Sequence, residues 1–301
     1  MHTGKTWFPI VNGVPRFNLS SSIQGKLSVF LKKYEKDIQN LFPLGDYTDL
    51  FPFKNQRNDV VSGSFSAQWS QYEYGSTTWG ATPESRANRL KVELGVDDES
   101  LKNKLLIDAG CGAGDFHSYA ERKYSVQIIL VDISDSVEEA FNRNAFNQNC
   151  HYVQCDLANI PLRKKIFDYA YSNGVLHHMD RPLDGFKQLA GLLKEGGVMY
   201  AWLYHEYEGF DKLYLLSRLV CRMPREAQLA ICKGLSLLIS AKMNIANILR
   251  DKKTHIPLYR ELIIMHMDAL APVYQSSHTQ GELKEWLLSN GLIRSLWWKI
   301  L

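Results

Sequence analysis

The chain has 301 residues, enough for one large domain with additions or for two ordinary domains, and so for a sizeable buried core. Its 45% hydrophobic and 22% charged residues exclude collagen-like, low-complexity and disordered chains. The net charge of +3 is too balanced to indicate a nucleic-acid binder, and five cysteines without a C-x-x-C pair argue against a disulfide framework and a structural zinc site.

The sequence shows no uninterrupted apolar run of about 18 residues, the length that a membrane-spanning helix needs. Residues 1–17 also lack the apolar segment of a secretory signal. We therefore expect a cytoplasmic protein without a transmembrane segment and without a bound metal.

Four blocks follow one another along the chain. Residues 1–83 form an aromatic, turn-rich N-terminal extension, with a helix expected near residues 23–41. Residues 84–204 alternate short apolar runs with helical patterns, which is typical of βαβ units and a parallel sheet. Residues 205–265 form a helical, basic insertion, and residues 266–301 return to the pattern of the core.

The core pattern predicts an α/β fold with a doubly wound, mostly parallel sheet, whose right-handed crossovers bring the carboxyl ends of the strands to one rim. Strands are expected at Lys104–Ala109, Gln127–Val131, His151–Cys155, Phe167–Ser172, Val198–Tyr204 and Leu292–Leu301. Helices are expected at Glu84–Leu94, Ser136–Phe146, Leu183–Leu193 and Gly281–Ser289.

The end of the first predicted strand carries the strongest motif, a G-x-G-x-G turn. Glycine lets the backbone bend sharply there and approach a ligand. Asp132, at the end of the second strand, is placed to accept hydrogen bonds from both ribose hydroxyls of a nucleoside, and Asp156 ends the third. For Asp132, a helix N-cap or a solvated loop position is the alternative, and for Asp156 the alternative is an acid that merely ends a strand, which is common. The turn reads Asp108-Ala109-Gly110-Cys111-Gly112-Ala113-Gly114.

The spacing also distinguishes between nucleotide ligands. A pyrophosphate cofactor usually needs G-x-G-x-x-G, whereas Gly114 is followed by Asp115, and Asp108 precedes the turn. Two acids beside the loop repel phosphates and attract a cation. A ligand with an adenosine, an ammonium group and no phosphate fits this pattern, and S-adenosylmethionine is such a ligand.

These motifs resemble, in order and spacing, those of class I S-adenosylmethionine-dependent methyltransferases over about residues 84–204. Beside the glycine turn, the resemblance is carried by Val131-Asp132-Ile133-Ser134, Asp156-Leu157, Phe167-Asp168, Gly174-Val175-Leu176-His177-His178 and Leu193-Lys194-Glu195-Gly196-Gly197. It implies a Rossmann-like, seven-stranded sheet with one reversed strand. Because the chain ends after the segment matched by Leu292–Leu301, we expect the sheet to be incomplete or rebuilt at that edge.

The resemblance also implies that S-adenosylmethionine is the cofactor. The glycines would face its methionine portion, Asp108 its ammonium group, Asp132 the ribose, and Asp156 with Leu157 the adenine. The residues expected to bind it are Asp108, Gly110, Cys111, Gly112, Gly114, Asp132, Ile133, Asp156, Leu157 and Asn173.

Methyl transfer to an oxygen or nitrogen atom that carries a proton needs a base, and histidine titrates in the useful range. His178 is the first candidate because it follows the fourth predicted strand beside the cofactor rim, and His205, after the fifth, is its rival. Two alternatives stay open: a histidine here often bonds only to backbone, and a carboxylate acceptor would need no base.

Acceptor contacts are expected from aromatic and histidine side chains. The crowded aromatic residues of the extension, Tyr74 among them, either close over the site or pack against the core. The segment Asp268–Tyr274 with His278 resembles one in small-molecule and sugar-modifying members, which indicates a small polar acceptor. The candidates are Tyr74, His177, Tyr204, Tyr274 and His278.

Residues 211–253 hold nine basic and three acidic residues, a local charge of +6 that leaves −3 for the rest of the chain. This insertion has four alternative roles: a cap over the acceptor pocket, a homodimer contact, a dock on an anionic membrane, or a solvated basic face.

We predict a methyltransferase that moves a methyl group from S-adenosylmethionine to an oxygen or nitrogen atom of a small molecule, such as a sugar or a carboxylate metabolite. RNA is an alternative acceptor, favoured by the basic insertion and by the resemblance of Phe8–Phe17 to the tail of a module found in RNA methyltransferases. The modest overall charge counts against nucleic acid. A non-catalytic S-adenosylmethionine-binding protein and an NAD-dependent oxidoreductase are the further alternatives.

Overall fold

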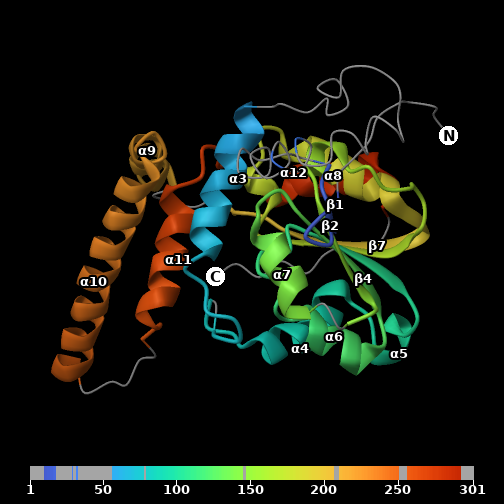
Figure 1. Ribbon diagram of the computed structural model, residues 1–301, viewed down its shortest axis with the longest axis horizontal. Coiled ribbons are helices and arrows are strands. Elements are labelled where there is room, and N and C mark those ends of the chain that lie inside the picture. The colour runs from blue at the N-terminus through green and yellow to red at the C-terminus, as the bar shows by residue number, and fades with distance from the viewer. Residues whose placement is uncertain are drawn as a thin grey trace.

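The computed structural model describes residues 10–17, 29, 32, 56–77, 79–144, 147–206, 210–250 and 256–292. A sheet of five parallel strands lies at its centre, in the spatial order β5-β4-β3-β6-β7 (Figure 1). The order reverses between β3 and β6, the position at which open α/β sheets bind ligands. The strands are β3 (Leu105–Ala109), β4 (Gln127–Asp132), β5 (Cys150–Gln154), β6 (Phe167–Asn173) and β7 (Leu193–Trp202).

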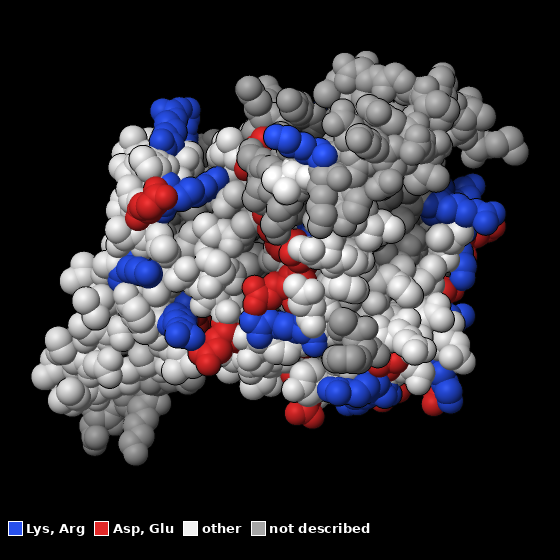
Figure 2. All heavy atoms as spheres, in the orientation of Figure 1, with Lys and Arg blue, Asp and Glu red and all other residues white. Residues whose placement is uncertain are grey.

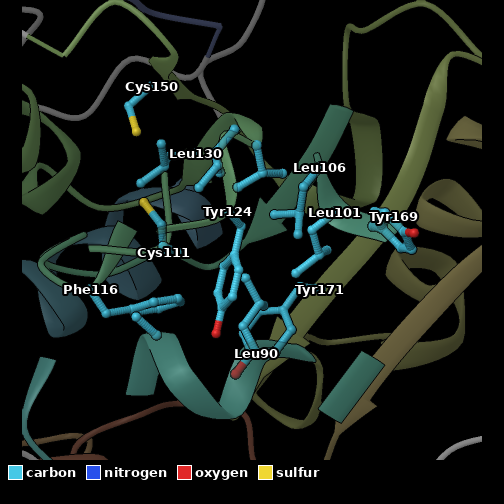
Figure 3. Packing of buried hydrophobic residues seen from close by; sticks show 14 of the residues in the cluster. Leu90, Leu101, Leu106, Cys111, Phe116, Tyr124, Leu130, Cys150, Tyr169 and Tyr171 are labelled. Carbon is cyan, nitrogen blue, oxygen red and sulfur yellow. The ribbon is translucent and has the colours of Figure 1, made fainter. Parts of the chain in front are cut away.

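Helices cover both faces of this sheet. One layer contains α4 (Pro83–Leu94), α5 (Asp98–Leu101), α6 (His117–Tyr124) and α7 (Ser136–Asn144). The other contains α8 (Pro182–Leu192) and α12 (Gln280–Ser289). The strands are apolar on both faces for this reason: in β3, Leu106 packs into the first layer and the next residue, Ile107, into the second. Figure 3 shows the buried cluster of the first layer, which includes Leu106 and Leu130 from the sheet and Leu90 of α4.

Local signals in the sequence explain where α4 begins and ends. The hydroxyl of Thr82 accepts a hydrogen bond from the backbone N–H of Ser85 at 3.1 Å, and Pro83 occupies the first turn. Gly95 follows the helix with a φ of +66°, a conformation that costs glycine little. The helix therefore lies against the sheet with Leu90 and Leu94 buried.

A short hairpin joins the N-terminal extension to the outer strand β5. Its strands are β1 (Ile10–Val11) and β2 (Val14–Pro15). Arg16 follows it and is fully buried, and its guanidinium donates to Gln154 Oε1 at 2.8 Å and to Glu138 Oε2 at 2.5 Å. These hydrogen bonds from Arg16 hold the hairpin against the edge of the sheet.

Four helices form a separate flank. They are α3 (Gln56–Trp69), α9 (Phe210–Val220), α10 (Arg225–Arg250) and α11 (Tyr259–Leu270). In Figure 1, α10 is the outermost of them, and α11 and α3 lie between it and the sheet. Val220, Cys232 and Met267 form the centre of a small apolar cluster that joins three of these helices, with Ala67 of α3 packed against it.

The five core strands lie where the sequence predicts them, except that β7 begins at Leu193, five residues before the expected start at Val198. It pairs with β6 from Phe167 onward, with a register irregularity that accommodates the Gly196-Gly197 segment. The reversed strand implied by the family resemblance is not among the described elements. The helix expected near residues 23–41 and the strand expected at 292–301 lie almost wholly outside the described residues. Helix α11 crosses the predicted block boundary at residue 265.

One helix bears on the expectation that no segment spans a membrane. Arg225–Leu249 is long and apolar enough to cross a membrane by length and composition, with a mean hydropathy of 1.4. Lys233 and Lys242 interrupt its apolar run without lowering that mean below the level of a span.

We expect Leu189→Ala to lower the free energy of unfolding by about 2–5 kcal/mol, because Leu189 is fully buried between α8 and the sheet. The matched substitution Leu288→Ala, at a leucine that is 66% exposed on α12, should change it by less than about 0.5 kcal/mol. Urea unfolding of both variants measures the difference, and equal losses would contradict the packing described here.

Candidate active site

The glycine turn that follows β3 is packed from three sides. Gly110, Gly112 and Gly114 have φ values of +88°, +54° and +62°, in the region that disfavours side chains. A Cβ atom on Gly110 would lie 2.2 Å from Cγ2 of Val175, and one on Gly112 would lie 2.4 Å from the ring of Trp69. These three positions therefore have neither the backbone conformation nor the space for any residue but glycine.

Asp132, at the end of β4, fastens this turn to the neighbouring strand. Its Oδ2 accepts a hydrogen bond from the backbone N–H of Gly112 at 2.8 Å, and its Oδ1 accepts from the N–H and the hydroxyl of Ser134 at 2.8 Å and 2.6 Å. Burial raises the pKa of Asp132, although these hydrogen bonds oppose the rise. Because a carboxylate offers about four acceptor positions, about one remains for a ligand hydroxyl.

The two acids beside the turn are not isolated anions. The imidazole Nε2 of His117 contacts Asp108 Oδ2, and both side chains are buried. Asp115 accepts hydrogen bonds from Tyr72 and from Arg86, whose Nη1 lies 3.2 Å from Asp115 Oδ1. Burial raises the pKa of Asp115 to about 6, whereas the Arg86 guanidinium stabilises its ionised form. The two acids therefore repel phosphate less strongly than two unpartnered carboxylates would.

Arg86 is a site residue that sequence reasoning missed. It lies on α4, lines the same cavity as Asp108 and Asp132, and stacks 4.9 Å from the centre of the Phe116 ring. Burial lowers the pKa of its guanidinium. An arginine in the middle of an amphipathic helix has no local signal that distinguishes it from a surface residue, and only the fold brings it to the glycine turn.

A cavity of about 1090 Å³ runs along the rim formed by the strand ends. This volume lies near the upper end of the roughly 300–1,000 Å³ typical of ligand pockets, so a cofactor and a small acceptor can share it. Gly112 and Gly114 belong to the adjoining turn but do not line it. The predicted cofactor residues that line it are Asp108, Gly110, Cys111, Asp132, Ile133, Asp156, Leu157 and Asn173.

Asp156 caps a short helix, a role that the sequence did not indicate. Its Oδ1 accepts a hydrogen bond from the N–H of Ala158 at 2.9 Å and so begins the short 3-10 helix Leu157–Asn159. Asp156, Leu157 and Ala158 also line the cavity. The cap therefore presents this turn to a ligand at the β5 end of the rim.

At the other end of the cavity, His178 lies between three elements. It ends a 3-10 helix, Leu176–His178, that follows β6. Its Nδ1 lies 3.2 Å from the carbonyl oxygen of Tyr274, to which it donates as the Nδ1–H tautomer, and its Nε2 lies 3.6 Å from Asp268 Oδ1. His178 is buried, lines the cavity, and its Nε2 has no hydrogen-bond partner among the described residues.

Asp268, from α11, was also missed by sequence reasoning as a site residue. Its Oδ2 accepts from the hydroxyl of Tyr204 at 2.6 Å and its Oδ1 from Gln68 of α3 at 3.2 Å. Burial would raise the pKa of Asp268, but the contact with His178 and the two hydrogen bonds outweigh it and lower the pKa. This carboxylate thus stays ionised and faces His178.

His177 is fully buried and does not line the cavity. Its ring stacks on Tyr204 with centroids 3.7 Å apart, and its Nδ1 accepts from the backbone N–H of Tyr204 at 3.1 Å. Burial, with the neighbouring His178 and His278, lowers the pKa of His177 well below the ordinary value of 6.5, so it is neutral. It supports Tyr204, which does line the cavity.

The remaining residues predicted to contact the acceptor or to act as the base differ in whether they line the cavity. Tyr274 lines it. Tyr74 does not: its hydroxyl donates to Asn144 Oδ1 at 2.8 Å, which holds it in a separate pocket of about 150 Å³. His205 and His278 pair with each other through a backbone bridge outside the cavity lining, and Nε2 of His278 is 2.8 Å from the hydroxyl of Ser276.

Comparison with known proteins agrees with this geometry. Residues 107–201, from β3 to β7, match the model of a methyltransferase domain. The chain is 30% identical over 132 residues to the human "Probable tRNA methyltransferase 9B", covering 41% of this chain and 28% of that protein. It is 34% identical over 105 residues to a tRNA U34 carboxymethyltransferase of Pseudoalteromonas translucida, covering 34% and 32% of the two chains. It is also 34% identical over 95 residues to a malonyl-[acyl-carrier protein] O-methyltransferase of Enterobacter lignolyticus, covering 31% and 36%.

The chain spans about a third of the length of these curated relatives. Residues 107–201 therefore carry a methyltransferase domain, the class of domain that the motifs predicted. S-adenosylmethionine is the cofactor of this class. The residues present fit it, because Gly110 and Cys111 of the turn, Asp132 and Arg86 all line one cavity.

Because Gly110 has no room for a Cβ atom, Gly110→Ala should weaken the binding of S-adenosylhomocysteine at least about ten-fold by displacing the turn. Gly75→Ala is the matched control: its φ of +85° is nearly the same, but nothing lies within 4 Å of its Cβ position. Titration calorimetry compares the two, and equal losses of affinity would mean that backbone strain alone, and not the packed turn, governs binding.

The neutral state of His177 predicts a pH-dependent stability. Its pKa is lowered in the folded protein, so the unfolded state binds more protons below about pH 6.5 and folding is weakened there. Urea unfolding at about pH 7.5 and about pH 5.5 should show the wild type losing about 1 kcal/mol more than His177→Gln over this interval. An identical pH dependence of the two proteins would contradict this, because it would show that folding leaves the pKa of His177 unchanged.

Proposed function

We propose that this protein transfers the methyl group of S-adenosylmethionine to an oxygen or nitrogen atom of a small molecule. The observation that supports this most directly is one continuous cavity, which has the glycine turn at one end and the His178, Asp268 and Tyr204 side chains at the other. Its volume of about 1090 Å³ allows a donor and an acceptor to lie side by side in a single space.

The chain's own residues suit the parts of the donor. Gly110 and Cys111 would lie along its methionine portion, the Arg86 guanidinium would pair with its carboxylate, and Asp108 would face its ammonium group. Asp132 would accept from the ribose, and Leu157 would pack on the adenine. When bound, S-adenosylmethionine supplies an electrophilic methyl group on a positively charged sulfur.

Alignment is the main contribution that the protein makes to such a transfer. Holding a nucleophile in line with the methyl group can account for about 7–11 kcal/mol of the barrier. Trp202 and Tyr204 line the acceptor end, with ring centroids 5.9 Å apart, and their faces exclude water and attract cationic charge. The aromatic wall therefore suits a reaction in which positive charge is dispersed.

His178 is the base in this proposal. With its Nδ1–H donated to the Tyr274 carbonyl, its Nε2 carries the lone pair that can take the proton of the acceptor group. The resulting imidazolium lies 3.6 Å from the ionised Asp268, which stabilises it. His205 has no place in this arrangement, because it does not line the cavity.

The charge of the cavity favours a small acceptor over RNA. Its lining holds seven acidic side chains against three arginines, and a polyanionic backbone would meet net repulsion there. The acids are Glu93, Asp108, Asp132, Asp156, Asp180, Asp184 and Asp268, and the arginines are Arg86, Arg89 and Arg181. The names of two relatives point to tRNA, so RNA belongs in the same experiment as a competing acceptor.

The test is to incubate the protein with methyl-labelled S-adenosylmethionine and, separately, a small-molecule cell extract and total tRNA. Label should enter the small-molecule fraction. With the acceptor so found, His178→Ala should lower kcat by about 10²–10⁴-fold and leave the affinity for S-adenosylhomocysteine unchanged. His205→Ala should retain the wild-type kcat.

If the label entered tRNA and not the small-molecule extract, the methyl acceptor would be RNA and not a small molecule. Binding of S-adenosylhomocysteine without transfer to either acceptor would favour a non-catalytic protein. A full kcat in His178→Ala would leave methyl transfer intact but remove the base, as expected for a carboxylate acceptor.

A further inference from the structure

The outer face of α9 and α10 is apolar and exposed. Nine of its side chains are at least 40% exposed, and the span Arg225–Leu249 is only 11% buried over its most apolar window. We call this face the α9–α10 surface, and we propose that it docks on an anionic membrane. Its apolar members are Leu215, Leu216, Leu219, Met223, Leu237, Leu238, Ile245, Ile248 and Leu249.

Helix α10 is apolar on two opposite sides, and the protein covers one of them. On the inner side, Cys232 packs into the cluster shared with α11, and Ser236 Oγ is 2.8 Å from Nδ1 of His266. On the outer side, exposed positions recur at helical spacing: Leu237 and Leu238, Ile245, then Ile248 and Leu249. A helix that is apolar all round is normally buried, so the outer side requires a second environment.

The inner contacts indicate that α10 lies on a membrane and does not cross it. Helix α11 packs between α10 and α3, and α11 also supplies Met265 and Asp268 to the cavity. Crossing the bilayer would expose the Ser236–His266 hydrogen bond and separate α10 from α11. Docking along the outer side leaves both intact and places the cavity one helix layer from the lipid.

Charge selects an anionic membrane as the occupant. Arg218, Arg222, Lys233 and Lys242 are all exposed on or beside the α9–α10 surface, and Glu226 is the one exposed acid among the described side chains of these two helices. Long basic side chains can lie along an apolar surface and place their charge among anionic headgroups. Two copies joined through the same face would bring these cations together. Figure 2 shows this flank as largely uncharged, with scattered basic side chains and some acidic ones.

The experiment uses the full chain with phosphatidylcholine vesicles that contain or lack phosphatidylglycerol. The protein should sediment with the anionic vesicles and be released as salt is raised. The double variant Leu238→Ser/Ile248→Ser should reduce partitioning at least about ten-fold, because both side chains leave water on docking. Lys233→Gln and Lys242→Gln should each reduce it about five-fold.

Leu288→Ser is the matched control, since Leu288 on α12 is 66% exposed and Leu238 is 67% exposed. It should partition like the wild type. The inference does not depend on methyl transfer, and cofactor binding by each variant reports that the fold is intact.

Three outcomes would overturn the proposal. The first is no binding to anionic vesicles. The second is a dimer in light scattering that Leu238→Ser/Ile248→Ser converts to a monomer without loss of vesicle binding, which would make this face a contact between two copies. The third is resistance of vesicle-bound protein to alkaline carbonate, which would indicate that α10 spans the bilayer.

Discussion

The hydrogen bond from the backbone of Gly112 to Asp132 is the constraint on which the site depends. It joins the turn after β3 to the end of β4 and so fixes the two strand ends that face a nucleoside. The bond is possible only because the turn adopts positive φ values with Val175 and Trp69 packed against it. Removing water from Asp132 is unfavourable by itself, and three donors to its carboxylate compensate for it.

The sheet and the cofactor rim could be predicted from the sequence because their signals are local. Each strand is a short apolar run buried on both faces, as the pattern of Leu106 and Ile107 illustrates, and each ends within a residue or two of a recognisable motif. Parallel pairing then brings those motifs together without further information. The cofactor end of the cavity therefore follows from spacing, and eight of its predicted residues line it.

The acceptor end could not be predicted in the same way, because its contacts join distant parts of the chain. Asp268 meets His178 across 90 positions of sequence and meets Gln68 across 200. Neither pair has a spacing rule, and each depends on how α3 and α11 pack. Tyr74 shows the converse: its aromatic surroundings suggested the site, but one hydrogen bond to Asn144 holds it elsewhere.

The net charge of the chain was a poor guide to its binding partners, because only the fold separates the regions of opposite charge. A total of +3 conceals a cavity with seven acids and three arginines and a helical surface where exposed bases outnumber acids. The two regions lie on opposite sides of α11, which separates an acidic enclosed space from a basic exposed one. The repulsion of a polyanion from the cavity and the attraction of an anionic surface to α9 and α10 are therefore compatible, since they arise in separate parts of the same fold.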